Sequence, residues 1–191
     1  MRAGVLAAAA LLAGCAGGPP PADWQLNARA ALAQYQRHYL AGDTPLAERE
    51  FAQARAELAR TGRADLIARA ELVRCAIRTA SLEFDDCPGF QALRTDAGAE
   101  EIAYAEYLAG RAARAATEEP LSRLVAAGVR LRAATIAPDG IAGAIEISAS
   151  QGWRRPLLAW LSVQAKRAEE GGDEAALSRI RRRIDLITTG K

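Results

Sequence analysis

Few side chains in this 191-residue chain could carry acid–base or metal chemistry. His38 is the single histidine, and Tyr35 and Tyr39 lie close to it in sequence. No serine or cysteine stands nearby to form a nucleophile pair with it. A metal site would need several histidine, cysteine or carboxylate ligands at set spacings. We therefore expect His38 to be a surface or packing residue, and we expect no catalytic residue, metal or cofactor.

The acidic side chains include adjacent pairs at 85–86, 118–119 and 169–170. Adjacent residues point to different sides of a helix, so such a pair does not form a catalytic carboxylate dyad. Glu118 and Glu119 precede Pro120, where negative charge favours the start of a helix. The glycine-rich motifs of nucleotide-binding loops do not occur in the sequence. These patterns favour a protein that is not an enzyme.

Residues 1–15 have the order of an export signal. A positive start precedes an apolar stretch over 3–12, which is too short to span a bilayer about 30 Å thick. The segment ends in Leu12-Ala13-Gly14-Cys15, which resembles the lipobox of bacterial lipoproteins. The resemblance implies that 1–14 is a signal peptide and that the Cys15 thiol is lipidated. The alternative is an ordinary signal peptide in which this cysteine is coincidental.

The residues after Cys15 suggest a tether and a destination. In lipoproteins of enteric bacteria, an aspartate directly after the lipidated cysteine is typical of retention in the inner membrane. This chain has Ala16 at that position. The resemblance therefore implies the periplasmic face of the outer membrane in preference to the inner membrane. Glycine and proline dominate 15–23, which favours an extended tether. The folded domain is then expected over 24–191.

Cys75 and Cys87 are the two cysteines that remain once Cys15 is assigned to the lipid. Export implies an oxidising compartment, in which such a pair tends to form a disulfide. The Cα atoms must approach within about 7 Å, which requires the helix that carries Cys75 to end near Ala80. The alternatives are two buried thiols or a redox-active pair, although the chain has no Cys-x-x-Cys spacing. We expect the disulfide.

Apolar residues recur at helical spacing along most of the chain, and no segment shows the alternation of a strand. Half of the residues are hydrophobic but only 5% are aromatic, and the abundance of alanine argues against an all-β fold. Thr44 is a predicted N-cap, Pro138-Asp139-Gly140 a predicted turn, and Asp173 the predicted cap of the last helix. We expect an all-α fold of about eight helices joined by short turns, which favour antiparallel neighbours. Their predicted stripes lie over 28–39, 47–58, 66–80, 102–112, 121–131, 141–150, 153–170 and 177–187.

Two helix pairs share a spacing of small and large residues. The first pair carries G-x4-A-x3-F-x2-A, and the last pair repeats it in part, with Arg183 where alanine is expected. The residues are Gly42, Ala47, Phe51 and Ala54 in the first, and Gly171, Ala176 and Ile180 in the last. The spacing resembles the second half of a tetratricopeptide repeat, which implies an α-solenoid of helical hairpins. The alternative is a plain alanine-rich helical domain.

All but two of the 25 cationic side chains are arginines. The guanidinium group is a planar fork that suits carboxylates and phosphates. We expect a C-terminal surface that binds an acidic partner or an anionic envelope polymer, although the arginine content could also reflect genome composition. The candidate residues on this surface are Arg154, Arg155, Arg179, Arg182 and Arg183. The formal net charge of only +2 gives no case for a nucleic-acid partner.

Taken together, these patterns predict a lipid-anchored periplasmic adaptor or scaffold. It would contact the membrane through the lipid on Cys15 and bind a protein partner in cell-envelope assembly. This function is what the resemblance implies, because tetratricopeptide-like lipoproteins commonly serve as scaffolds of envelope machines. One alternative is an envelope enzyme or a small-ligand binder with a pocket between the helices. Another is a purely structural lipoprotein.

Overall fold

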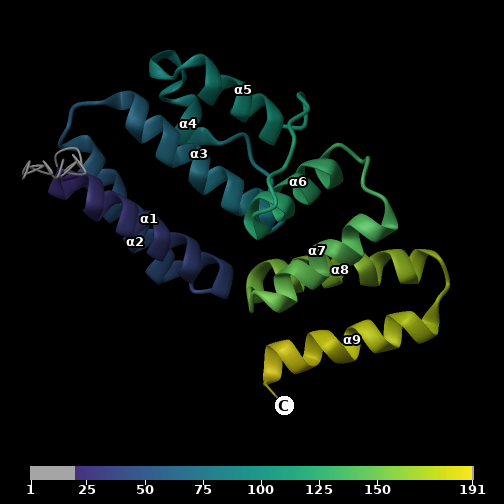
Figure 1. Ribbon diagram of the computed structural model, residues 1–191. Coiled ribbons are helices and arrows are strands. Elements are labelled where there is room, and N and C mark those ends of the chain that lie inside the picture. Colours follow the sequence, from purple (N-terminus) through teal and green to yellow (C-terminus); the bar gives the residue numbers. More distant parts are fainter. Residues whose placement is uncertain (1–19, 191) are drawn as a thin grey trace, which may run out of the picture.

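The computed structural model describes residues 20–190 of the chain, so Cys15, the predicted signal peptide and the first part of the tether lie outside the described residues. The described part consists of helices and connecting turns without a strand, which confirms the all-α prediction (Figure 1). Besides one short 3₁₀ helix at Arg94–Asp96, the described residues form nine α-helices. They are α1 (Asp23–Ala41), α2 (Thr44–Ala59), α3 (Ala64–Ala80), α4 (Pro88–Gln91), α5 (Ala99–Leu108), α6 (Pro120–Arg132), α7 (Pro138–Ser150), α8 (Arg154–Glu170) and α9 (Glu174–Thr189).

Three boundaries differ from the sequence prediction. The four-residue helix α4 directly follows Cys87, in a stretch predicted to be irregular. Helix α5 ends at Leu108, before the predicted residue Ala112, because Gly110 turns the chain at a φ of +76°. Helix α7 already begins at Pro138, since proline suits the first turn of a helix, so the predicted turn at this point is wrong.

Aspartate side chains cap the second helix of two hairpins. Asp43 Oδ1 accepts a hydrogen bond from the Leu46 amide at 3.1 Å, so Asp43 and not Thr44 is the N-cap of α2. Asp173 Oδ1 accepts one from the Ala176 amide at 2.8 Å, which confirms the predicted cap of α9. Each aspartate satisfies an amide that has no partner inside its helix.

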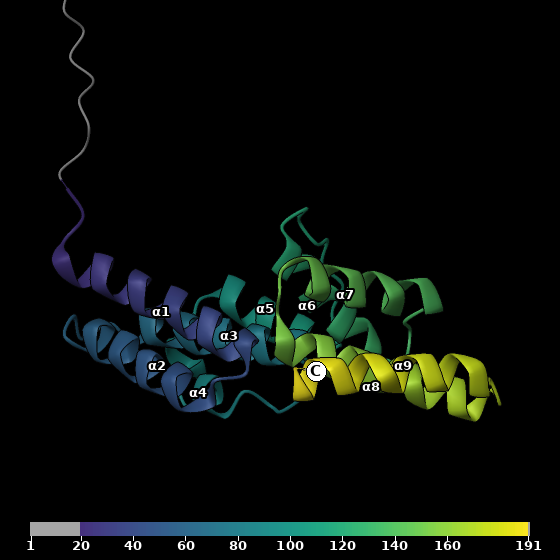
Figure 2. The ribbon, with the colours of Figure 1, turned by 90° about the horizontal axis from the view of Figure 1, so that it is seen from below.

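Helices that follow one another in sequence pack together at both ends of the molecule. In Figures 1 and 2 the pair α1–α2 lies at one end and the pair α8–α9 at the other, with α7 also packed against α8. Helix α3 lies between these groups and contacts α1, α2, α5 and α6. No helix in the described part is long and apolar enough to cross a membrane.

The hydrophobic core consists of two clusters, and α3 contributes to both. The smaller cluster is built from α1 and α2, and Ile77 of α3 joins it. The larger cluster spans α3 to α9 and includes Cys75 and Leu72 of α3 together with the fully buried Trp160 of α8. Trp160 Nε1 donates a hydrogen bond to the Ala80 carbonyl oxygen at 3.1 Å, so α8 is fixed to the end of α3.

Candidate functional site

The predicted arginine surface is present on α9. Arg179, Arg182 and Arg183 are all exposed. The helical period of 3.6 places them, together with Leu186, within about one third of the helix circumference. Leu186 is 58% exposed, whereas the other side of α9 packs against α8. We call the surface of Arg179, Arg182 and Arg183 the α9 arginine face.

The charge of this face is not neutralised by acidic side chains of the described part. Arg179 and Arg183 form no ion pair with any residue between 20 and 190. Arg182 Nη1 donates only to Ser178 Oγ, at 2.7 Å. Arg181 lies on the other side of the helix and pairs with Glu169 Oε1 at 3.2 Å. The α9 arginine face therefore presents three guanidinium groups that have no acidic partner in the described part.

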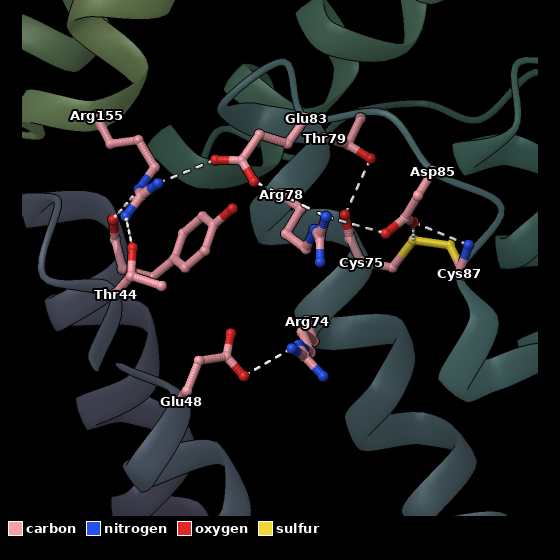
Figure 3. Close-up of polar contacts among 11 residues, drawn as sticks. Thr44, Glu48, Arg74, Cys75, Arg78, Thr79, Glu83, Asp85, Cys87 and Arg155 are labelled. Atoms are coloured by element: carbon pink, nitrogen blue, oxygen red, sulfur yellow. Dashed lines mark hydrogen bonds and ion pairs between the residues drawn. A yellow bond between two sulfur atoms is a disulfide. The ribbon is translucent and has the colours of Figure 1, made fainter. Parts of the chain in front are cut away.

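Arg155 was predicted to belong to this surface, and the structure shows that this prediction is wrong. Its Nε donates to the Tyr39 carbonyl oxygen at 2.7 Å, and its Nη2 donates to Thr44 Oγ1 at 2.6 Å (Figure 3). Its Nη1 pairs with Glu83 Oε1 at 3.0 Å, and only 21% of the side chain is exposed. The reason is that α8 packs against α1, which directs Arg155 into that contact. Arg154 stays exposed and donates to the Ile187 carbonyl oxygen of α9 at 3.3 Å.

The Arg155–Glu83 pair continues into a chain of alternating charges (Figure 3). Glu83 also lies 3.8 Å from Arg78 Nη2, which pairs with Asp85 Oδ2 at 3.2 Å. Arg74 of α3 pairs with Glu48 of α2 at 2.6 Å. Each acid of this chain and of the separate Arg74–Glu48 pair has an arginine partner, so these ion pairs hold helices together. The Nε atoms of Arg74 and Arg78 are buried without a hydrogen-bond partner within residues 20–190.

Cys75 and Cys87 are joined by a disulfide in the structure, with Cα atoms 5.7 Å apart (Figure 3). Helix α3 ends at Ala80, as the sequence prediction requires, so the chain can return to Cys75. Asp85 Oδ1 accepts a hydrogen bond from the Cys87 amide at 2.9 Å and thereby fixes the turn. The bridge connects α3 to the start of α4.

The same residues form the group that comes closest to a metal site in the described part. The ligand atoms of Cys75, Asp85 and Cys87 lie within 4.8 Å of one another. The two sulfurs are bonded to each other, however, and Asp85 is already engaged by Arg78 and by the Cys87 amide. Cysteine binds a metal as a thiolate, so neither sulfur can act as a ligand while the disulfide is closed, and the group is structural in that state.

His38 lies half-buried in the last turn of α1, where its Nε2 is 3.2 Å from Arg37 Nη2. Within residues 20–190 no hydrogen bond joins it to a carboxylate or a serine, and it belongs to no metal-ligand group. Its neighbours give it no geometry for acid–base catalysis.

Two buried tyrosine hydroxyls are a feature that the sequence did not predict. Tyr35 and Tyr39 are 0% and 2% exposed, and neither hydroxyl has a hydrogen-bond partner among the described residues. Burial raises the pKa of both phenols, and Glu83 raises that of Tyr39 further. The guanidinium of Arg155 lies over the Tyr39 ring, 4.2 Å from its centroid. The only sequence signal was a pair of tyrosines four residues apart on an apolar stripe.

The described part thus combines a closed network around Arg155 with an open charged surface on α9. Nothing in the geometry of the disulfide or of His38 adds a reactive centre. Comparison of the chain with protein-family models, with curated proteins and with solved structures finds no match. The function is therefore argued from the chemistry of the chain's own residues.

Proposed function

We propose that the protein is a lipid-anchored periplasmic adaptor that binds an acidic surface of an envelope protein through the α9 arginine face. The observation that carries this proposal is the set of three exposed guanidinium groups on one side of α9 without acidic partners in the described part. Guanidinium groups bind carboxylates bidentately, and Arg is enriched at protein interfaces. Arg154 extends the same surface from α8, because it contacts the end of α9.

Membrane attachment through Cys15 is the second part of the proposal. Its support is the sequence Leu12-Ala13-Gly14-Cys15 and the glycine- and proline-rich tether that follows. The disulfide between Cys75 and Cys87 suits an oxidising compartment such as the periplasm. The lipid would hold the protein at the outer membrane, with the helical domain extending into the periplasm.

A tetratricopeptide-like solenoid is the architecture we propose for the domain. Its support is that Ala47, Phe51 and Ala54, which carry the repeat-like spacing, are all buried on α2. The helices α1–α2 and α8–α9 form hairpins at the two ends. In such an arrangement the terminal helix carries a polar outer face, and here that face is the α9 arginine face.

The adaptor proposal is tested by charge reversal on α9. The variant Arg179→Glu/Arg182→Glu/Arg183→Glu should lose its crosslinked partner in native envelopes, as identified by mass spectrometry. Binding of the partner by the unaltered protein should weaken as the salt concentration rises, because exposed charges are screened over about 8 Å at physiological ionic strength. All three changes lie on an exposed surface, so the fold should be retained.

The matched control reverses three other exposed arginines that form no ion pair within residues 20–190: Arg29, Arg49 and Arg123. This control has the same net charge as the α9 variant and should keep the partner. Loss of the partner in both variants would show a net-charge effect, and retention in both would refute the α9 interface.

The lipid anchor is tested separately by growth with labelled palmitate. The protein should incorporate the label, and Cys15→Ala should abolish incorporation because the thiol is the site of acylation. Cys75→Ala/Cys87→Ala serves as the control and should remain labelled. Label that persists in the Cys15→Ala protein would refute lipidation at this residue.

A further inference from the structure

A hollow of about 320 Å³ lies between α3, α5, α6 and the loop over 109–119. Its apolar walls come from α3 and α6, and two tyrosines of α5 complete them. Ile77 and Val125 are almost fully buried and form the floor of the hollow, whereas Val73, Tyr104 and Leu121 are half-buried and present more of their surface to it. The residues of its wall are Val73, Ala76, Ile77, Tyr104, Tyr107, Leu121 and Val125. This volume and lining are those of small-molecule sites in proteins.

A second hollow of about 250 Å³ adjoins the first between α3 and α5. Val73, Tyr104 and Arg114 line both hollows, so the side chains of Tyr104 and Arg114 mark the point where they meet. In the second hollow Arg69 pairs with Glu101 at 2.6 Å, and Glu100 adds a negative charge. An anionic group is therefore favoured beside Arg114 and disfavoured in the second hollow, beside Glu100 and Glu101.

Arg114 is the free charge of the first hollow. Its guanidinium lies over the Tyr104 ring, 5.1 Å from the centroid, and it forms no ion pair within residues 20–190. The other charged residue of the lining, Glu119, caps α6 by accepting hydrogen bonds from the amides of Leu121 and Ser122, at 3.0 and 2.7 Å. The helix N-terminus thereby offsets the negative charge of Glu119.

Tyr104 and Tyr107 supply two phenol donors, and Thr117 and Ser122 also line the hollow. Among residues 20–190 no hydrogen bond to either phenol is found, and the two rings lie 5.7 Å apart. Burial raises the pKa of Tyr104 to about 12 and also raises that of Tyr107, so both hydroxyls remain protonated donors at neutral pH. Arg114 lies near both phenols and acts against this rise.

We propose that the first hollow binds a medium-chain aliphatic carboxylate. The alkyl chain lies against Val73 and Leu121, and the carboxylate lies at Arg114, where Tyr104 and Tyr107 donate hydrogen bonds to it. A bound peptide would bring several backbone N–H and C=O groups into walls that are apolar, and each unpaired group would weaken binding. A single anionic head on an apolar chain matches the Arg114 guanidinium, which is unpaired within residues 20–190, and the two phenol donors.

Isothermal titration of the full chain with decanoate tests the proposal, with decanol as the uncharged ligand and decylamine as the cationic one. Decanoate should bind, decanol should bind at least about tenfold more weakly, and decylamine more weakly still, because a charge-assisted hydrogen bond is lost. Arg114→Gln should weaken decanoate about tenfold and leave decanol unchanged. Arg114 is exposed, so this variant should fold.

Arg111→Gln is the matched control, because Arg111 lies in the same loop but its guanidinium is paired with Glu106. Decanoate affinity should be unchanged in this variant. A third variant, Val73→Phe, places a larger side chain in the wall and should weaken decanoate and decanol alike, with circular dichroism to verify the fold. Absence of decanoate binding, equal affinity for decanol, or an unchanged affinity in Arg114→Gln would overturn the proposal.

Discussion

A glycine permits a close approach between the backbones of α3 and α6. Gly128 of α6 lies directly against the carbonyl oxygen of Thr79 in α3, and a Cβ atom at this position would overlap with that oxygen. Both partners are helix backbone, which shifts less easily than the end of a flexible side chain. The contact between α3 and α6 therefore depends on glycine at this position.

We expect Gly128→Ala to lower the free energy of unfolding by about 1–3 kcal/mol, because the new methyl group forces the helices apart. Alanine would stabilise an exposed helix by about 1 kcal/mol, so the overlap reverses the usual sign. Gly143 of α7 is the control, since a Cβ there would meet open space. Urea denaturation of both variants measures the difference, and a stabilised Gly128→Ala protein would contradict the steric argument.

The sequence could identify residue types at the candidate sites, but it could not assign all of their partners. The pairing of Cys75 with Cys87 followed from their number and from the turn between them. Arg154 and Arg155 are equivalent in sequence, and only the contact of α8 with α1 directs Arg155 inward. The hollow beside Arg114 was not predicted either, because its walls come from three helices that are distant in sequence.

At the scale of helices, the turn Gly-Asp begins the second helix of two hairpins. Gly42 at a φ of +98° and Gly172 at +70° reverse the chain, and the following aspartate caps the next helix. Glycine adopts these left-handed angles without strain. The two turns therefore reverse the chain and cap the following helix in the same way, at opposite ends of the molecule.

Removal of the cap by Asp43→Ala should cost about 1 kcal/mol of unfolding free energy, because the Leu46 amide loses its acceptor. Asp23→Ala is the control: Asp23 lies in the first turn of α1 but caps no amide, so its loss should cost only a few tenths of a kcal/mol. Thermal denaturation of the two variants provides the comparison. An equal loss in both would show that charge at the helix end, and not the cap, matters.

Long helices were predictable because their apolar stripes extend over several turns, whereas short ones were not. Helix α4 has four residues, too few for a stripe, and it begins where Cys87 is tied to α3. The start of α7 was missed because Pro138-Asp139-Gly140 suits a turn as well as the first turn of a helix. Local sequence cannot distinguish these outcomes when tertiary contacts decide.

At the scale of the molecule, Arg155 ties the C-terminal helices to the first hairpin. Its guanidinium bonds to Tyr39 and Thr44 at the α1–α2 turn and to Glu83 after α3. One side chain therefore joins segments that are far apart in sequence. The Arg155 side chain is 21% exposed and that of Glu83 39%, so solvent screens the ion pair in part, and the three charge-assisted hydrogen bonds act together.

Arg155→Ala should lower the unfolding free energy by about 2 kcal/mol, because Glu83 and the turn lose their common partner. Hydrogen exchange should become faster at the α1–α2 turn. Arg154→Ala removes a single exposed hydrogen bond to Ile187 and should cost less than about 0.5 kcal/mol. Unchanged exchange at the turn in Arg155→Ala would mean that the contact does not couple the two ends.

The membership of α3 in both core clusters also determines when the chain can fold during synthesis. The hairpin α1–α2 emerges from the ribosome first, but its cluster lacks Ile77 until α3 follows. The other side of α3 stays uncovered until α6 and Trp160 of α8 emerge. The core of the described domain therefore cannot close around α3 before α8 has been synthesised, so a nascent chain that ends before α8 should expose apolar surface of α3.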